Sequence, residues 1–168
     1  DAAGYYEFAH KSLAEYFVAF KFTAELGCLA QNFSQTYCEA SGRVCKIPFD
    51  PKDIENLAQN FGFMLLRDEQ MKAVRELLWE MLDESCTQKL WKLIDETKHK
   101  APEQLNYCGA NAVYLLNRKG ESFEKAAMAH ACLLSADFSR ISLNNADLQG
   151  AYLGEATLGV HSTPEKTN

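Results

Sequence analysis

Large apolar residues recur at every fifth position near the C-terminal end of the chain, and this spacing restricts the folds open to that segment. The eight positions are Phe123, Met128, Leu133, Phe138, Leu143, Leu148, Leu153 and Leu158. Two residues before them, six of eight positions hold Ala: Ala126, Ala131, Ala136, Ala146, Ala151 and Ala156. A helix repeats every 3.6 residues and a strand every two, so neither explains a period of five. A stacked coil with one small and one large inward residue per unit does explain it.

Two of these five-residue units carry a recognisable pattern. Residues 136–140 (Ala-Asp-Phe-Ser-Arg) and 146–150 (Ala-Asp-Leu-Gln-Gly) resemble the pentapeptide-repeat unit A-(D/N)-L-x-x. That family folds as a right-handed, four-sided β-helix with four units per coil, so the resemblance implies two coils over residues 121–160. Successive coils would stack at about 4.8 Å around a ladder of Leu and Phe. Glu121 and Ile141 depart from the small-residue pattern, so we expect a frayed start at Glu121 and a bulge or wider face at Ile141.

A second motif lies near the N-terminal end, where residues 8–19 read Phe-Ala-His-Lys-Ser-Leu-Ala-Glu-Tyr-Phe-Val-Ala. This segment resembles the signature F-x-H-x-S-F-x-E-Y-F-x-A, which ends the winged-helix domain of NACHT-type STAND NTPases, and it departs at Leu13, where Phe is usual. In that family the His contacts the phosphates of bound ADP. The resemblance assigns this role to His10 in an intact parent protein, and an imidazole can donate a hydrogen bond to a phosphate oxygen. Residues 111–118 are similar to linkers in bacterial STAND proteins.

Between the two motifs the apolar spacing is helical. Ser12 and Glu15 match a capping box, and residues 5–10 before them predict a short strand. The expected helix starts are Ser12, Asp50 with Pro51, Asp68, Ser85 and Pro102, and the expected stops are Gly27 and Gly120. Residues 31–49 are compatible with a continued helix or with irregular structure. Short connections between the helices imply antiparallel packing.

The sequence therefore predicts a mixed α plus β chain with an N-terminal short strand and helical bundle followed by a short right-handed quadrilateral β-helix. The expected parts are the end of a winged-helix-like domain (1–28), a helical bundle (29–120), a pentapeptide-repeat β-helix of about two coils (121–160) and a tail (161–168). Because the chain opens without Met and moves at once into a structured pattern, we expect a piece of a longer protein.

Charge and composition exclude several classes of function. The net charge is −6 and the isoelectric point is about 5.2, which disfavours general nucleic-acid binding. No apolar run approaches the roughly 20 residues needed to span a bilayer. The six Cys residues form no C-x-x-C pair and lie away from the His residues, so a structural zinc site is disfavoured and free thiols in the cytoplasm are expected.

The sequence carries no phosphate-binding loop of the form G-x-x-x-x-G-K-[ST], so we expect no enzyme, no metal and no cofactor in this chain. ATP or ADP is expected in the parent protein, which the resemblance makes an ATPase. Weaker site candidates have structural explanations as helix caps, core aromatics or exposed charges; they are Glu15, Trp79, Trp91, Lys98-His99-Lys100, Asp50 with Asp53, and Asp83 with Glu84.

These features favour a non-catalytic regulatory and interaction module from the C-terminal part of a STAND-type signalling NTPase. Its expected partners are a protein ligand or a second copy, and the upstream nucleotide-binding domain of the parent, with no nucleic acid and no membrane. The alternative is a pentapeptide-repeat protein that mimics DNA and inhibits a topoisomerase. Acidity favours that alternative, but two coils reach only about 10 Å, which is short for a duplex mimic.

Overall fold

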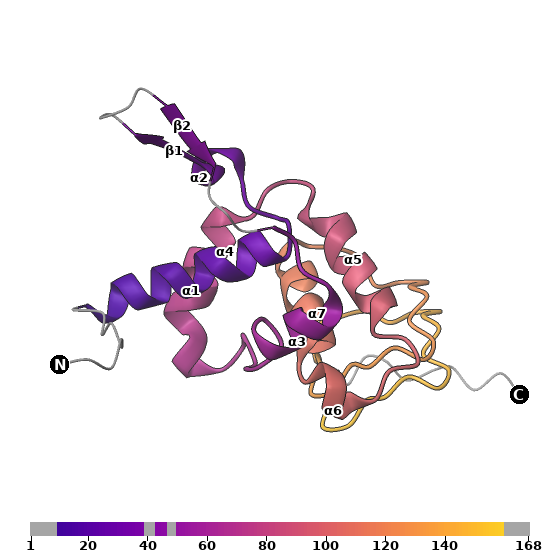
Figure 1. The fold of residues 1–168 in the computed structure, drawn as a ribbon. Coiled ribbons are helices and arrows are strands. Elements are labelled where there is room, and N and C mark those ends of the chain that lie inside the picture. The colour runs from indigo at the N-terminus through magenta and orange to yellow at the C-terminus, as the bar shows by residue number, and fades with distance from the viewer. Residues whose placement is uncertain (1–9, 39–42, 47–49, 160–168) are drawn as a thin grey trace, which may run out of the picture.

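The computed structural model describes residues 10–38, 43–46 and 50–159. A group of helices leads into stacked loops formed by the C-terminal part of the described chain (Figure 1). Helix α1 (Lys11–Glu25) packs along α4 (Lys72–Met81), and α5 (Cys86–Glu96) packs along α7 (Cys108–Arg118). The loops lie beside α5 and α7, so these two helices connect the repeats to the rest of the chain.

The remaining elements are short. They are α2 (Gln31–Ser34), β1 (Gln35–Cys38), β2 (Arg43–Lys46), α3 (Ile54–Gln59), the 3-10 helix η1 (Glu69–Met71), α6 (Pro102–Leu105), β3 (Asp137–Phe138) and β4 (Thr157–Leu158). Strands β1 and β2 pair antiparallel and project from the helices (Figure 1). The region that the sequence left open between helix and irregular structure thus contains a short helix and a hairpin. The predicted strand over residues 5–10 and the tail at 161–168 fall outside the described residues, apart from His10.

The first helix starts without the predicted capping box. Its N-cap is His10, whose carbonyl accepts the Leu13 amide at 3.1 Å, and no side chain caps the first turn. The prediction for Ser12 and Glu15 is therefore wrong, because both lie inside the helix and Glu15 pairs instead with Lys11 at 3.6 Å.

The end of the first helix follows the sequence. Gly27 has a φ of +69°, a conformation that favours glycine. Its amide bonds to the Ala24 carbonyl and the Cys28 amide bonds to the Thr23 carbonyl, each at 2.9 Å. These two bonds form a Schellman motif, so the predicted stop at Gly27 is confirmed.

Three other predicted boundaries need correction. Asp50 starts no helix, because α3 begins at Ile54 and its N-cap is Asp53, whose carboxylate accepts the Asn56 amide at 2.9 Å. Asp68 precedes η1 and makes no side-chain cap. The single last helix expected from Pro102 is broken into α6 and α7, since Asn106 between them has a φ of +49° and ends α6.

The core is continuous from the helices into the repeats. Its fully buried side chains include Phe61, Leu78, Leu90, Ile94, Leu115 and Leu116 from the helical part and Phe123, Met128, Leu133 and Phe138 from the loops. Buried Asn111 fixes the irregular segment before η1 to α7. Its side-chain oxygen accepts the Leu66 amide at 2.8 Å, and its amide nitrogen donates to the Phe61 and Met64 carbonyls at 2.7 and 2.8 Å.

Candidate protein-interaction site

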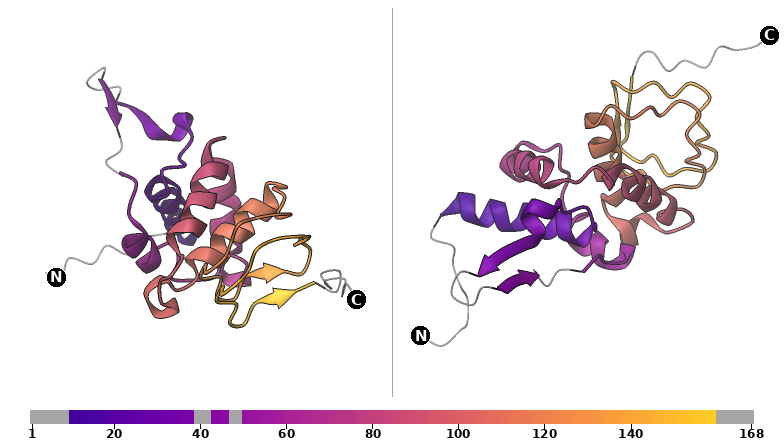
Figure 2. Two further views of the ribbon diagram at one scale, coloured as in Figure 1. Left: turned by 90° about the vertical axis from the view of Figure 1, so that its right-hand side faces the viewer. Right: turned by 90° about the horizontal axis from the view of Figure 1, so that it is seen from above.

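The loops of residues 121–159 are two turns, and paired positions of the two turns lie four repeat units apart. Parallel pairing joins Ala127 to Asp147, Cys132 to Tyr152, and β3 to β4. The amides of Asp147, Tyr152 and Thr157 bond at 2.9 Å to carbonyls of the first turn, at Ala126, Ala131 and Ala136. Seen from above, the two turns trace a similar four-cornered outline (Figure 2). One full turn thus takes four of the five-residue units.

The corners show why the unit is five residues long. The amide of each small-position residue from 126 to 156 bonds to the carbonyl three residues earlier, which belongs to a large apolar residue. The residue before the small position has a positive φ at six of the seven corners: Lys125, His130, Ser135, Asn145, Gly150 and Glu155. Positive φ at this place is the signature of a type II turn. Arg140 is absent from this set and precedes Ile141, so the turn changes where the small residue is replaced.

The polar residue of the repeat unit also has a structural reason. The carboxylate of Asp137 accepts the Ser139 amide at 2.9 Å, and that of Asp147 accepts the Gln149 amide at 3.0 Å. Short side chains that bond two residues ahead stabilise such turns. Partial burial alone would raise the pKa of Asp137, but the hydrogen bonds from Ser139 and the charge of Arg67 outweigh it and lower that pKa.

Burial along the large-residue ladder depends on the turn. All four members in the first turn are buried, from Phe123 to Phe138. In the second turn Leu143, Leu148 and Leu153 are half-buried, and Leu158 is 55% exposed. The small positions follow the same trend, since Ala131 and Ala136 are buried whereas Ala126, Ala146, Ala151 and Ala156 are half-buried, like Glu121 and Ile141. The first turn lies between the helices and the second turn, whereas no described segment covers the far side of the second turn.

The segment after α5 runs along the first turn and holds it by polar contacts. The Thr97 hydroxyl accepts the Cys132 amide at 3.1 Å and donates to the Ile94 carbonyl at 2.6 Å. The His99 amide donates to the His130 carbonyl at 3.0 Å, and the two imidazole rings stack with centroids 4.5 Å apart. The basic stretch of residues 98–100 therefore joins the repeats to the helices, which explains it without an anion site.

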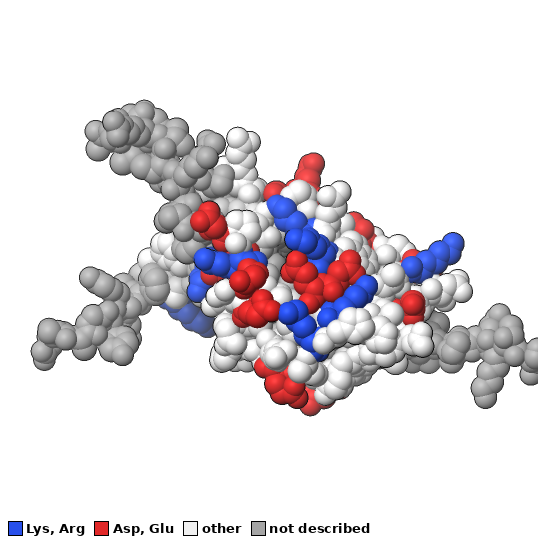
Figure 3. Space-filling model, turned by 45° about the vertical axis from the view of Figure 1, so that its right-hand side comes forward, with Lys and Arg blue, Asp and Glu red and all other residues white. Residues whose placement is uncertain are grey.

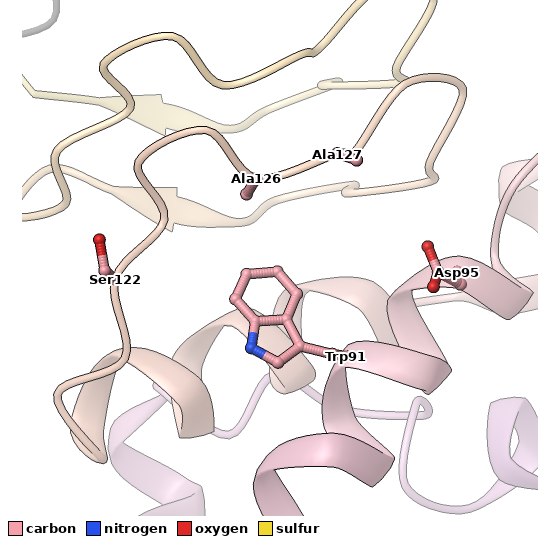
Figure 4. Close-up of a pocket in the computed structure, with 5 residues that line it drawn as sticks. All are labelled: Trp91, Asp95, Ser122, Ala126 and Ala127. Atoms are coloured by element: carbon pink, nitrogen blue, oxygen red, sulfur yellow. The ribbon is translucent and has the colours of Figure 1, made fainter.

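Trp91 joins α5 to the repeats from the apolar side. Its ring lies against that of Phe123, with centroids 5.0 Å apart. Another part of the indole borders a hollow of about 260 Å³ lined by Trp91, Asp95, Ser122, Ala126 and Ala127 (Figure 4). Asp95 is already paired with Lys98 at 2.7 Å. Trp91 is thus first a packing residue of the junction, as the bundle interpretation expected.

The other candidate residues do not converge on a catalytic arrangement. His10 is exposed at the start of α1. Trp79 lies under the Arg118 guanidinium at 4.8 Å. Asp83 accepts the Ser85 hydroxyl at 2.8 Å and pairs with Lys89 at 3.8 Å. Within residues 10–38, 43–46 and 50–159, no group of three His, Cys, Asp or Glu side chains could hold a metal ion.

Charges of both signs are interspersed on the face shown in Figure 3, where acidic and basic side chains alternate over short distances. On the repeats the exposed residues Glu124 and Glu155 share the surface with Lys125 and Arg140. A duplex mimic would need a continuous acidic stripe, and the face in view does not present one. Among the described helices, none combines the length and the apolar character of a membrane span.

Comparison with known proteins supports the repeat assignment. The profile of the family "Pentapeptide repeats" matches residues 122–159 as eight copies, so the predicted repeats are confirmed. The chain is also 31% identical over 165 residues to an uncharacterized WD repeat-containing protein of Nostoc sp. (strain PCC 7120), a match that covers 81% of this chain. The chain spans about a tenth of that relative's length. No solved structure matches the chain.

Proposed function

We propose that this chain, in which residues 122–159 are pentapeptide repeats, is a non-catalytic interaction and regulatory module. The observation that carries the proposal is the junction: the first turn of the repeats shares one buried core with α5 and α7. A partner bound to the repeats would therefore act on the helices directly. Repeat stacks commonly provide extended binding surfaces, and this one carries no convergent catalytic groups among the described residues.

The repeat segment is best interpreted as a short right-handed, four-sided β-helix of two coils. Three features support this fold. Pairing is parallel between positions four repeat units apart, hydrogen-bonded corners recur once in every unit, and the large residues of the first turn are buried. The paired segments on the sides of the coil are shorter than a regular strand. This is consistent with a coil that turns a corner in every five-residue unit.

The parent protein that we propose is a STAND-type signalling NTPase, with residues 1–28 as the end of its winged-helix domain and 29–120 as a helical connector. The support is the motif of residues 8–19 and the exposure of His10 within it. In such a parent, His10 would bind the phosphates of ADP and hold the inactive state. Ligand binding to the repeats would shift the equilibrium between inactive and active states through contacts that differ between them.

Protein ligands or a second copy are the partners that fit this surface, together with the upstream nucleotide-binding domain. The mixed charges in Figure 3 and the two-turn length favour this scaffold over a duplex mimic that inhibits a topoisomerase. The chain would work in the cytoplasm, where the parent's nucleotide is available.

The scaffold can be tested by site-specific photo-crosslinking in cells that express the parent protein. A crosslinker at the exposed repeat positions Arg140 or Gln149 should capture a defined protein, and one at exposed Lys92 on α5 serves as the matched control. Equal capture from all three positions would contradict a binding surface on the repeats.

The STAND assignment has a separate test. The gene upstream of the Asp1 codon should encode a phosphate-binding loop, and the purified parent should carry ADP that His10→Ala reduces. A parent without a nucleotide-binding domain would overturn the assignment and leave the scaffold proposal intact.

A further inference from the structure

Two buried cysteines meet where the chain leaves α1 and enters α5. Cys28 closes the Schellman motif at the end of α1, and Cys86 is the first residue of α5. Both side chains are fully buried and both are free thiols. The hairpin, α3 and α4 all lie between them in the chain, so only the fold brings them together.

Backbone pairing fixes their proximity. Leu29 and Leu82 form an antiparallel bridge, and the Asp83 amide donates to the Cys28 carbonyl at 2.7 Å. The Cys86 amide bonds back to the Asp83 carbonyl at 3.4 Å, which places the first turn of α5 directly after this bridge. This pairing brings the two buried thiols close enough to affect each other's pKa.

Positive charge surrounds the pair. Lys89 donates from its ammonium group to the Gly27 carbonyl, and the Lys119 ammonium donates to the Asp83 carbonyl at 3.5 Å, where its charge also lowers the pKa of Cys86. The first turn of α5 adds the positive end of a helix dipole. Asp83 is an acidic group that acts on both thiols, and it is itself paired with Lys89.

These surroundings give the two sulfurs different roles. The interaction with Cys28, together with Lys119, lowers the pKa of Cys86 below its usual value, whereas the same interaction and burial raise the pKa of Cys28. Cys86 therefore deprotonates more readily than Cys28, whose thiol donates to the Leu26 carbonyl at 3.4 Å. A thiolate beside a thiol is the arrangement in which oxidation of one sulfur is followed by attack of the other.

We propose that Cys28 and Cys86 form a redox-sensitive dithiol that peroxide converts into a disulfide. In the first step the Cys86 sulfur attacks one oxygen of hydrogen peroxide, the O–O bond breaks, and a sulfenic acid and one water form. In the second step the Cys28 sulfur attacks the sulfenic sulfur, the S–O bond breaks, and a disulfide and a second water form. Both sulfurs are oxidised, the peroxide is reduced, and the two thiol protons leave in the waters.

The disulfide would tie the end of α1 to the start of α5, one of the two helices that contact the repeats. A cytosolic reductant would reverse it, so the bond would be transient. Because both sulfurs are buried, peroxide must enter during local opening of the bridge between Leu29 and Leu82. We therefore expect slower oxidation than for an exposed thiolate.

Peptide mapping after peroxide treatment of the folded chain tests the proposal. Trypsin leaves Cys28 and Cys38 in one peptide, residues 22–43, so the experiment uses a Cys38→Ser, Cys45→Ser background. Without reductant, peptide 22–43 should be linked to peptide 76–89, and dithiothreitol should separate them. Cys108 and Cys132, which are also buried, are the internal control. Their links should form at least about tenfold more slowly, since burial raises the pKa of both.

Single variants order the two steps. Cys28→Ser should abolish the disulfide and leave a Cys86 sulfenic acid that dimedone traps, whereas Cys86→Ser should leave Cys28 unmodified. Lys119→Gln should slow the oxidation severalfold. Circular dichroism would verify that each variant is folded. The proposal is overturned if the folded Cys38→Ser, Cys45→Ser chain remains fully reduced, or if Cys28 pairs with Cys108 or Cys132 as readily as with Cys86.

Discussion

Gly109 of α7 faces the backbone carbonyl of Cys132 in the first repeat turn so closely that a β-carbon at Gly109 would overlap the carbonyl oxygen. This contact lets the helix lie directly on the repeat backbone. Cys108 and Ala112 on the same helix are also fully buried. The repeats and the helices are therefore joined by close packing, and substitutions at this junction should be the most informative.

Gly109→Ala should destabilise the chain, although Ala is ordinarily the better helix residue by up to about 1 kcal/mol. The added methyl must push the first repeat turn away from α7, and such overpacking costs about 1–3 kcal/mol. Urea unfolding followed by circular dichroism measures the change. Asn117→Ala, at an exposed position of the same helix, is the control and should be neutral or stabilising. A stabilised Gly109→Ala would show that the junction is loose.

Asn111→Ala should lower the free energy of unfolding by about 2–4 kcal/mol, because three buried backbone groups lose their partner. Those groups are the Leu66 amide and the Phe61 and Met64 carbonyls. Amide hydrogen exchange should show the loss of protection first at Leu66. If exchange at Leu66 is unchanged, the side chain does not hold this segment.

The ladder predicts unequal effects of truncation in the two turns. Phe138→Ala removes a fully buried ring and should cost about 3–5 kcal/mol. Leu158→Ala removes a side chain that is 55% exposed and should cost about 1 kcal/mol or less. Thermal unfolding of both variants measures the difference. Equal losses would mean that the second turn is covered as well as the first.

The acid stability of the repeats should depend on Asp137, whose pKa is lowered in the folded chain. A carboxyl group with a lowered folded pKa adds stability above its unfolded pKa of about 3.9, and this is lost as the pH falls through the folded pKa. Asp137→Asn keeps an acceptor for the Ser139 amide but no longer titrates. The melting temperature of the Asp137→Asn variant should therefore fall less than that of the unsubstituted chain between roughly pH 5 and pH 2. Parallel curves would contradict this role.

The sequence by itself determined the repeat period, because each five-residue unit carries its own corner and its own inward residues, and local chemistry of this kind is written in the order of residues. The stop at Gly27 was visible for the same reason, since a helix end that needs a positive φ favours glycine. Tertiary structure decided which of several competent residues acts as a cap, so Asp53 replaced Asp50 and the box at Ser12 and Glu15 did not form. It also decided how deeply each ladder residue is buried and which cysteines meet. Those properties depend on segments far apart in the chain, such as Cys28 and Cys86, whose approach requires the whole helical core to pack.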